Sequence, residues 1–401
     1  MKKILIISFY FPPFLNMRSI RASKIAKYLE REGWEVHVLS ADGLNIEKGL
    51  PVEINGDRVK RIALSKGSKS FSIPSQFKKS KILRKFFNYQ DRFLKWYLKA
   101  LKEGRKIIDR EGFPLILSFS PPYPSNILAS KLSREFDLPW IAEFGDLWSE
   151  NYYLKRIFPL SVLEKFLEKR VLKRASSIIS VSENLSQRLE RIHGKDIFIF
   201  PHFFDDEDYK ENVPLLPNFT LTYTGHLYPY QNFKPFLNAL EIMKEENILK
   251  KIKVRFFSYN HYEIKDWFKD FLDLNLEINP PISYKENLEA QSSSTALLFF
   301  SVKEESKEFE NPMKGKIFSY IGARKPVLVV GEDEGGKFLE KIGIGKICRN
   351  EMEIKETIEK WLKEFEKFGF LRAGDFIDWE SYSYKNRILI LSNFLEKFLK
   401  R

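Results

Sequence analysis

Short apolar runs alternate with helix-length amphipathic segments along almost the whole chain, and this alternation restricts the fold more than any other feature of the sequence. Parallel strands need a crossover between them, and a helix is the usual crossover. A chain of this kind builds parallel sheets with helices on both faces. We expect strands at 3–8, 34–39, 59–64, 115–119, 140–144, 175–181, 197–200, 219–223, 254–258, 276–278, 296–300 and 327–330. We expect helices at 20–31, 126–136, 160–172, from 182 onward, 232–247, 263–272, 284–291, 316–323, 352–367 and 382–400.

The alternation falls into two halves, which an acidic, proline-containing and aperiodic stretch at 205–217 separates. A length of 401 residues suits two domains at roughly 100–200 residues each. The expected fold class is therefore α/β with two Rossmann-like domains, 1–204 and 205–380, followed by a terminal helix in 381–401. Neither half has the G-x-G-x-x-G fingerprint of dinucleotide binding. Two such halves predict a cleft lined by the carboxyl ends of both sheets.

Composition limits the environment and the partners. Cys348 is the single cysteine, so an internal disulfide is excluded, and the pattern fits either a reducing compartment or a lineage that avoids thiols. The basic start and apolar run at the N-terminus are interrupted by Pro12 and Pro13, which favours a first core strand over a signal peptide. The net charge of +13 suits an anionic partner. Zinc-finger spacing, an RNA-binding aromatic signature and a long basic tail are absent, so no nucleic-acid partner is expected.

The stretch 71–110 mixes aromatic side chains with lysines and arginines at helical spacing. Basic helices with aromatic faces lie in membrane interfaces, which would give the protein an anionic membrane surface as a partner. The aromatic residues fit a buried core equally well, with the basic residues on the solvated face. Both interpretations stay open at this point.

The stretch 311–331 reads as a turn, a short helix, a break at Pro326 and a buried strand. A helix N-terminus presents free N–H groups and partial positive charge, so it attracts anions. Lys314 and Lys316 add two full charges where this helix begins. The stretch therefore predicts a diphosphate site, against the simpler alternative of solvated lysines at a helix start.

Polar residues also follow two strands of the first half. Asn16, Arg18 and Arg21 lie in the loop and helix start after the first strand, and the alternative is that they only cap and solvate that helix. Asp146 and Trp148 follow the strand at 140–144. Ligands of such sheets sit outside the carboxyl ends of the strands, so these side chains predict a polar pocket.

Four stretches together resemble the GT-B glycosyltransferases, and specifically the retaining enzymes of family 4. They are residues 4–13, 140–148, 223–227, and 316–320 with the following 325–328. The resemblance implies that the second domain holds a nucleotide diphosphate sugar, that the first domain holds the acceptor, and that the terminal helix crosses back onto the first domain. It also implies that basic side chains and helix N–H groups neutralise the diphosphate, with no metal and no other cofactor.

The function that the resemblance implies is transfer of a hexose to a glycan or lipid-linked acceptor with retention of configuration, in polysaccharide biosynthesis. The enzyme would be cytoplasmic or peripheral at the inner face of the membrane. Its expected catalytic residues are Asp146, His226 and Lys316. Its expected donor-binding residues are Thr224, Gly225, Lys234, Lys314, Gly315, Ser319 and Tyr320. Its expected acceptor-binding residues are Asn16, Arg18 and Trp148.

The sequence departs from the family at one conspicuous place. The family commonly carries two glutamates separated by seven residues, and in that register this chain has Asn311 and Ser319. Two alternatives therefore accompany the transferase. One is a sugar-nucleotide-binding protein with degenerate catalytic positions, and the other is a sugar-nucleotide epimerase of similar fold.

Overall fold

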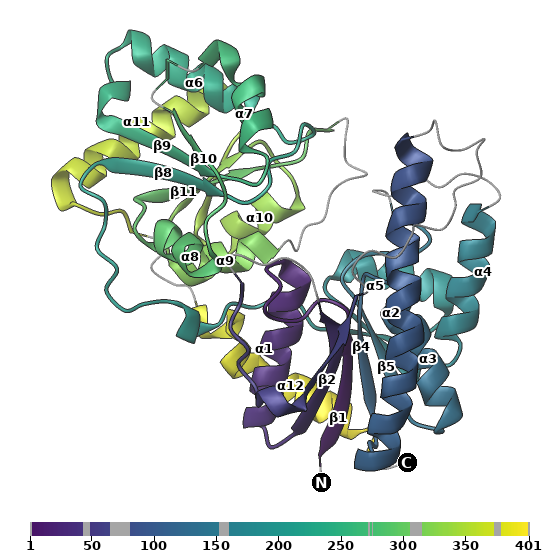
Figure 1. Cartoon of the computed structure of the whole chain (residues 1–401). Helices are drawn as coiled ribbons and strands as arrows, with labels where there is room; N and C mark the ends of the chain where they lie inside the picture. The colour runs from purple at the N-terminus through teal and green to yellow at the C-terminus, as the bar shows by residue number, and fades with distance from the viewer. Residues whose placement is uncertain are drawn as a thin grey trace. The chain divides into compact units, whose positions relative to one another are not determined.

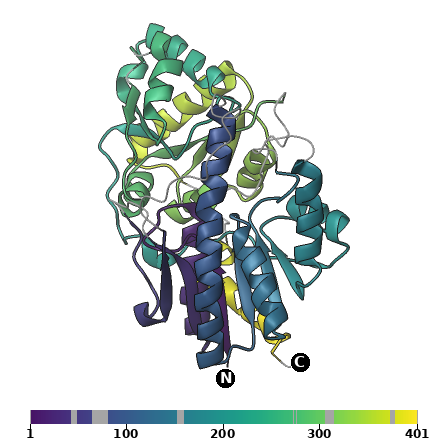
Figure 2. The same ribbon diagram turned by 45° about the vertical axis from the view of Figure 1, so that its right-hand side comes forward.

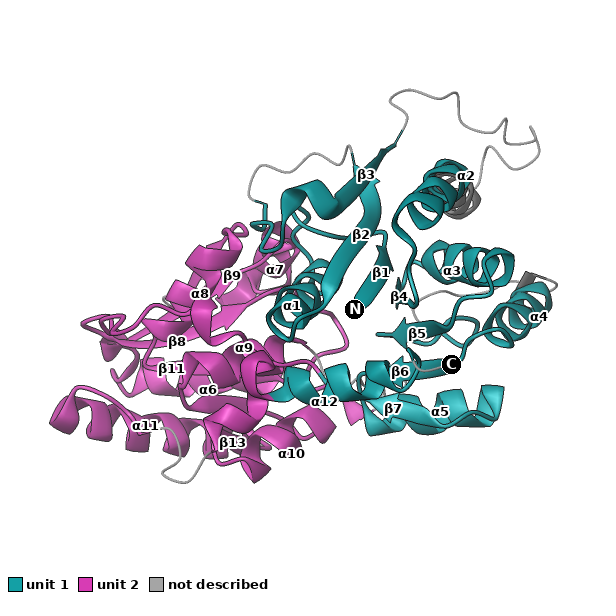
Figure 3. Ribbon diagram, turned by 90° about the horizontal axis from the view of Figure 1, so that it is seen from below, with its two compact units in different colours: residues 1–201, 387–401 teal, residues 202–386 magenta. Residues whose placement is uncertain are grey.

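The structure is a computed structural model that describes residues 2–42, 49–64, 81–151, 160–271, 273–274, 276–304, 315–372 and 378–399. The chain forms two compact units, shown in different colours in Figure 3. The first unit consists of residues 1–201 with 387–401, and the second of residues 202–386.

The first unit is built on a seven-stranded parallel sheet with the order β3-β2-β1-β4-β5-β6-β7. Its strands are β1 (Lys3–Ser8), β2 (Glu35–Asp42), β3 (Val59–Ala63), β4 (Ile116–Ser120), β5 (Trp140–Phe144), β6 (Ser177–Ser180) and β7 (Ile197–Ile199). The order reverses direction between β1 and β4. In such sheets the loops that follow the strands at the reversal point form the ligand site.

Helices cover both faces of this sheet (Figure 3). They are α1 (Met17–Arg31), α2 (Lys81–Glu111), α3 (Pro124–Glu135), α4 (Leu160–Leu172), α5 (Glu183–His193) and α12 (Tyr384–Glu396). Helix α2 runs along the sheet in Figure 2. On the opposite face, the Phe394 ring of α12 stacks on Phe198 of β7 with a 4.0 Å centroid distance, and the Trp34 indole donates to Ser392 Oγ at 2.8 Å. The end of α12 is thereby part of the first unit's core.

The basic, aromatic stretch at 71–110 supplies core residues where the structure describes it. Trp96 is fully buried in the cluster that includes Phe9 and Ile107, and Tyr97 packs against the same cluster. For Trp96, the structure therefore supports a place in the buried core and not in a membrane interface. Residues 71–80 and the side chains of 81–94 lie outside the described part of the chain.

The second unit is built on a six-stranded parallel sheet with the order β10-β9-β8-β11-β12-β13. Its strands are β8 (Phe219–Thr224), β9 (Ile252–Phe257), β10 (Leu276–Asn279), β11 (Ala296–Phe300), β12 (Val327–Val330) and β13 (Gly345–Cys348). Its helices, which are labelled in Figure 1, are α6 (Lys234–Glu245), α7 (His261–Trp267), α8 (Tyr284–Ser292), α9 (Gly315–Ala323), α10 (Glu334–Lys341) and α11 (Glu351–Phe368).

Strand β12 is apolar at every position because both of its faces are buried. Leu328 and Val330 point into the cluster that α6 and α11 cover, whereas Val327 and Val329 point into the cluster that α9 covers. A strand buried on both faces needs apolar residues at every position. The predicted α/β fold with two Rossmann-like domains is confirmed.

Two elements of the second unit escaped the sequence analysis, α10 and β13. Helix α10 contains Gly335 and Gly336 and strand β13 begins at Gly345, and glycine weakens helix and strand propensity. The glycines of α10 allow the helix to approach the sheet closely. A Cβ on Gly336 would lie 2.7 Å from Val329 Cγ1, and one on Gly335 would lie 3.0 Å from Phe299 Cζ.

The interpretation of 205–217 as a separating linker is wrong, because this segment packs onto the second unit. Asp205 caps a 3₁₀ turn at Asp206–Asp208, and the Tyr209 hydroxyl donates to the Ser319 carbonyl of α9 at 2.9 Å. The Leu216 N–H donates to the Ser293 carbonyl at 2.9 Å. The aperiodic sequence of 205–217 indicates that the segment has little regular secondary structure. It does not indicate whether the segment packs against the rest of the unit.

Candidate functional site

The candidate donor site lies where the second sheet reverses direction, between β8 and β11. The turn 224–226 follows β8, and α9 is the helix that follows β11. Loops at such a reversal point diverge to opposite faces of the sheet and leave room for a ligand. The sequence placed the diphosphate at the start of α9 and the family motif at 223–227, and both segments belong to this edge.

Lys316 in the first turn of α9 lies against Gly225. A Cβ on Gly225 would be 3.2 Å from Lys316 Cε and 3.5 Å from its Nζ. Gly225 has a φ of +101°, which residues with a side chain rarely adopt. The glycine therefore provides both the turn and the space that the lysine occupies. Its N–H donates to the Phe257 carbonyl of β9, so it helps to fix the turn.

The ammonium group of Lys316 rests on an aromatic ring. Its Nζ is 3.6 Å from the ring centroid of Tyr223, which is fully buried. The Tyr223 hydroxyl donates to the His226 carbonyl at 2.8 Å, so the same side chain supports the lysine and holds the turn. Burial raises the pKa of Tyr223 well above its ordinary value, so the ring stays neutral. The face of an aromatic ring attracts a cation, so this contact helps to hold the Lys316 ammonium group in place.

His226 lies near Lys316. Its ring centroid is 4.4 Å from that of Tyr228, which covers part of it. Partial burial lowers the pKa of His226; Glu263 raises the pKa and the Lys316 charge lowers it again, and the net direction is down. The structure thus brings the predicted residues Gly225, His226 and Lys316 together.

The remaining predicted donor-binding residues hold other positions. The Thr224 hydroxyl accepts from Gln291 Nε2 at 2.8 Å, and the Ser319 hydroxyl donates to the Lys316 carbonyl at 2.9 Å. Lys234 is exposed at the start of α6. Lys314, like Asn311, lies outside the described residues, and Gly315 is the first residue of α9.

Tyr320 supports the site from within the core. Its side chain is fully buried, and its hydroxyl donates to the Leu298 carbonyl at 3.0 Å. Burial raises the pKa of this hydroxyl above its ordinary value. The side chain therefore ties α9 to β11 and does not face solvent.

In the first unit, the predicted residues Arg18 and Asp146 form an ion pair between the start of α1 and the turn after β5. The pair is partly exposed, with side-chain exposures of 32% and 22%. Gly145 leaves room for it, since a Cβ there would be 3.0 Å from Arg18 Nη1. The sequence placed both residues at the carboxyl edge of the sheet, and the structure shows that they are partners.

A second, buried ion pair lies beneath them. Arg21 Nε is 2.6 Å from Glu143 Oε1, both side chains are 3% exposed, and Arg21 also donates to the Phe200 and Pro201 carbonyls. Burial raises the pKa of Glu143, although the charge of Arg21 opposes this. Glu143 is not recognisable from the sequence as a site residue, because a lone glutamate inside an apolar strand gives no signal of its partner.

Asn16 and Trp148 have structural contacts. Asn16 Oδ1 accepts from the Ser19 N–H at 2.8 Å and so caps α1. Trp148 is 2% exposed, and its ring stacks on Tyr123 at a 4.9 Å centroid distance. Its indole N–H donates to Glu164 Oε1 at 3.2 Å. The buried indole thus anchors the turn that carries Asp146.

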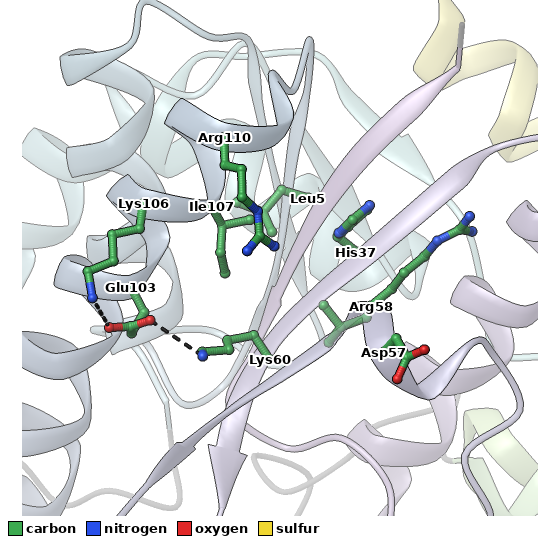
Figure 4. Close-up of a pocket in the computed structure, with 10 residues that line it drawn as sticks. Leu5, His37, Asp57, Arg58, Lys60, Glu103, Lys106, Ile107 and Arg110 are labelled. Carbon is green, nitrogen blue, oxygen red and sulfur yellow. Dashed lines mark hydrogen bonds and ion pairs between the residues drawn. The ribbon is translucent and has the colours of Figure 1, made fainter.

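A cavity of about 300 Å³ in the first unit lies away from this edge, between α2 and the strands β2 and β3 (Figure 4). Its floor is apolar and its rim is charged. Glu103 in the rim is bracketed by Lys106 at 2.9 Å and Lys60 at 3.5 Å. Arg58 and Arg110 of the same rim pair with Glu30 and Glu111, and we assign the cavity no ligand.

Comparison with known proteins bears on this geometry. Residues 20–208 match the model of Glycosyltransferase Family 4. No curated protein matches the chain. The structure of Anabaena Alr3699/HepE in complex with UDP and glucose gives a TM-score of 0.64 at 10% identity, over 99% of this chain and 100% of that chain. The structure of a glycosyltransferase from Rickettsia africae gives a TM-score of 0.64 at 12% identity, over 100% of this chain and 99% of that chain.

The chain has the GT-B fold, and its residues 20–208 resemble the family 4 glycosyltransferases. The UDP-GlcNAc 2-epimerase from Methanocaldococcus jannaschii also shares the GT-B architecture, with a TM-score of 0.56 at 12% identity over 99% of this chain and 100% of that chain. At sequence identities this low, the structural similarity establishes the fold alone. The chemistry of this GT-B protein therefore has to be argued from its own residues.

Proposed function

We propose that this GT-B protein is a retaining hexosyltransferase of polysaccharide biosynthesis. It moves a sugar from a nucleoside diphosphate donor to a glycan or lipid-linked acceptor, in the cytoplasm or at the inner face of the membrane. The observation that carries the proposal is the contact between Lys316 and Gly225 at the start of α9. A lysine fixed beside a helix N-terminus is a preorganised anion site, and such sites contribute most where charge develops in the transition state.

In this proposal the diphosphate lies against the first turn of α9. Lys316 and the N–H groups of that turn bind the leaving oxygens, and the Gly225 backbone approaches them closely because it has no side chain. His226 binds the same diphosphate by hydrogen bonding. Neutralisation by these groups makes a metal unnecessary for departure of the leaving group. HepE, whose structure holds UDP and glucose, supports the choice of UDP as the first nucleotide to test.

Asp146 orients the acceptor hydroxyl or the transferred sugar. Its carboxylate is partly exposed and held by Arg18, so it is positioned for hydrogen bonding to a hydroxyl group. The role of Asp146 in this proposal is to hold the acceptor hydroxyl or the sugar in the orientation that transfer needs. General acid or base catalysis is the smaller contribution.

A thermal-shift panel tests the binding step, because a ligand that binds only the folded state raises the melting temperature. The panel contains UDP, GDP, ADP and their hexose conjugates, and we expect one nucleotide family to stabilise the protein. Incubation of the stabilising donor with acceptor glycans, followed by NMR of the product anomer, tests the transfer. Retained configuration supports the proposal, and failure of every nucleotide to bind overturns it.

The epimerase remains the second candidate because epimerases share this fold. Its signature is a new nucleotide sugar formed without any acceptor. Binding with neither product would identify a sugar-nucleotide-binding protein with degenerate catalytic positions, as the residue Ser319 in place of a family glutamate suggests.

A further inference from the structure

Helix α4 (Leu160–Leu172) has apolar side chains on two opposite sides. Val171 and Leu172 are buried in the core of the first unit. On the other side lie exposed apolar side chains at i, i+1, i+4 and i+5 spacing, which places them on one stripe. These are Val162, Leu163, Phe166 and Leu167, with exposures of 55%, 61%, 65% and 40%. A helix that is apolar on both sides is normally covered on both sides, so this stripe indicates an interaction surface.

The charges of α4 are sorted between its two sides. The acids face inward: Glu164 accepts the Trp148 indole N–H, and Glu168 accepts the Ser149 N–H at 3.0 Å and contacts His193. The bases face outward. In the described segment 161–173, every exposed side chain is either apolar or basic. The exposed basic residues are Lys165, which pairs with Glu150 at 3.4 Å, and Lys169, Arg170 and Lys173.

We propose that the outer side of α4 docks on an anionic lipid bilayer. An interfacial helix buries an apolar stripe at the level of the headgroups while flanking lysines and arginines contact anionic lipid. The four apolar residues occupy the first turns of α4, and three of the four basic residues follow them. A second copy of the chain fits this surface poorly, since a twofold contact would place like charges opposite each other. Among the described residues, no helix meets the length and hydropathy needed to span a membrane, so the contact is peripheral.

The inner side of α4 connects this surface to the candidate acceptor site. Glu164 and Glu168 hold Trp148 and Ser149, which directly follow the turn that carries Asp146. The helix that lies on the bilayer thus also fixes the acceptor loop. On the basis of the proposed function, this arrangement selects a lipid-linked acceptor over a soluble glycan.

Co-sedimentation with vesicles tests the inference with the full-length protein. We expect binding to phosphatidylcholine vesicles that contain phosphatidylglycerol, weaker binding at high salt, and little binding to pure phosphatidylcholine. Two variants of α4 should each lower the partition coefficient about tenfold or more, because one removes apolar residues that enter the interface and the other removes basic residues that anionic lipid attracts. They are Leu163→Ser with Phe166→Ser, and Lys169→Glu with Arg170→Glu and Lys173→Glu.

Matched variants on α11 control for the loss of apolar surface and for the change in net charge. They are Met352→Ser with Phe368→Ser, and Lys360→Glu with Lys363→Glu and Lys367→Glu, all at exposed positions. These should bind vesicles like the wild type. Equal losses in the α4 and α11 variants overturn the inference, and so does the absence of any vesicle binding. A dimer that the α4 apolar variant converts to a monomer, without vesicle binding, would identify a second copy as the occupant.

The UDP thermal shift is measured on the same samples. Loss of vesicle binding with UDP binding intact shows that the variants remain folded. Conversely, vesicle binding without any nucleotide binding would overturn the proposed function but would still support membrane docking through α4.

Discussion

Lys316 Cε lies 3.2 Å from the point where a side chain on Gly225 would begin. The two residues are far apart in sequence, yet the parallel order β8-β11 brings the turn after β8 and the start of α9 to the same edge of the sheet. Any side chain at position 225 would therefore meet Lys316. This contact therefore defines how the proposed diphosphate site can be tested.

Gly225→Ala should weaken nucleotide binding as well as stability. The positive φ costs about 1–3 kcal/mol in a residue with a side chain, and the new Cβ displaces Lys316. Gly194→Ala is the matched control, because Gly194 also has a positive φ but a Cβ there meets no atom within 4 Å. We expect both variants to lower the melting temperature and only Gly225→Ala to reduce UDP affinity. Equal affinities in the two variants would argue against the close approach of Gly225 to the diphosphate.

Asp146→Asn should lower kcat by roughly 100-fold if the carboxylate orients the reacting groups, with little change in UDP affinity. The measurement is transfer by the donor that the thermal-shift panel selects. Asp137→Asn is the control, since Asp137 also pairs with an arginine, Arg174, but its side chain is 95% exposed. A variant with wild-type kcat would remove Asp146 from the catalytic residues.

Glu143→Ala should destabilise the first unit strongly. Removal of one partner of a buried ion pair leaves an uncompensated charge, which costs about 3–5 kcal/mol. Arg21 would keep its two carbonyl partners but lose its carboxylate. Urea unfolding measures the loss. Glu135→Ala, which breaks a pair with the more exposed Arg105, should cost far less, and a similar cost in both variants would contradict the importance of burial.

His226 should make stability depend on pH. Its folded-state pKa is lowered, so the unfolded chain binds the proton first as the pH falls below about 6.5. Above that pH the imidazole is neutral in both states and has no effect. The melting temperature of the wild type should therefore fall more between pH 7.5 and pH 5.5 than that of His226→Gln. Saturating UDP should reduce this difference, because the diphosphate favours the protonated imidazole. If the dependence of the melting temperature on pH is the same with and without UDP, His226 does not contact the diphosphate.

The fold was largely predictable because the dominant signals are local. Strands such as β1, β5, β11 and β12 are bounded by turn residues and match their expected ranges residue for residue. The misses occurred where tertiary contacts override propensity. Gly335 and Gly336 lower helix propensity, but the close approach to β12 requires them. Tyr209 lies in an aperiodic segment whose packing depends on a hydrogen bond to distant Ser319.

The site was predictable only as a set of candidates. Position at strand ends and helix starts identified Lys316, Arg18 and Asp146, since these rules depend on topology, and the family resemblance added Gly225. The pairing of Arg18 with Asp146 was not predictable, because it joins segments that only the folded sheet brings together. The burial of Trp148 and Tyr320 was also hidden, since an aromatic residue beside a motif has the same sequence signal whether it contacts ligand or core.

Isothermal titration of UDP into Lys316→Ala tests the central claim most directly. Loss of a charged hydrogen bond of about 1.5–3 kcal/mol corresponds to roughly a 10- to 150-fold weaker affinity. Lys316→Arg should recover part of the loss, and Lys337→Ala, at an exposed lysine of α10, should bind like the wild type. An unchanged affinity in Lys316→Ala, with wild-type binding confirmed, would show that the diphosphate does not lie at the start of α9.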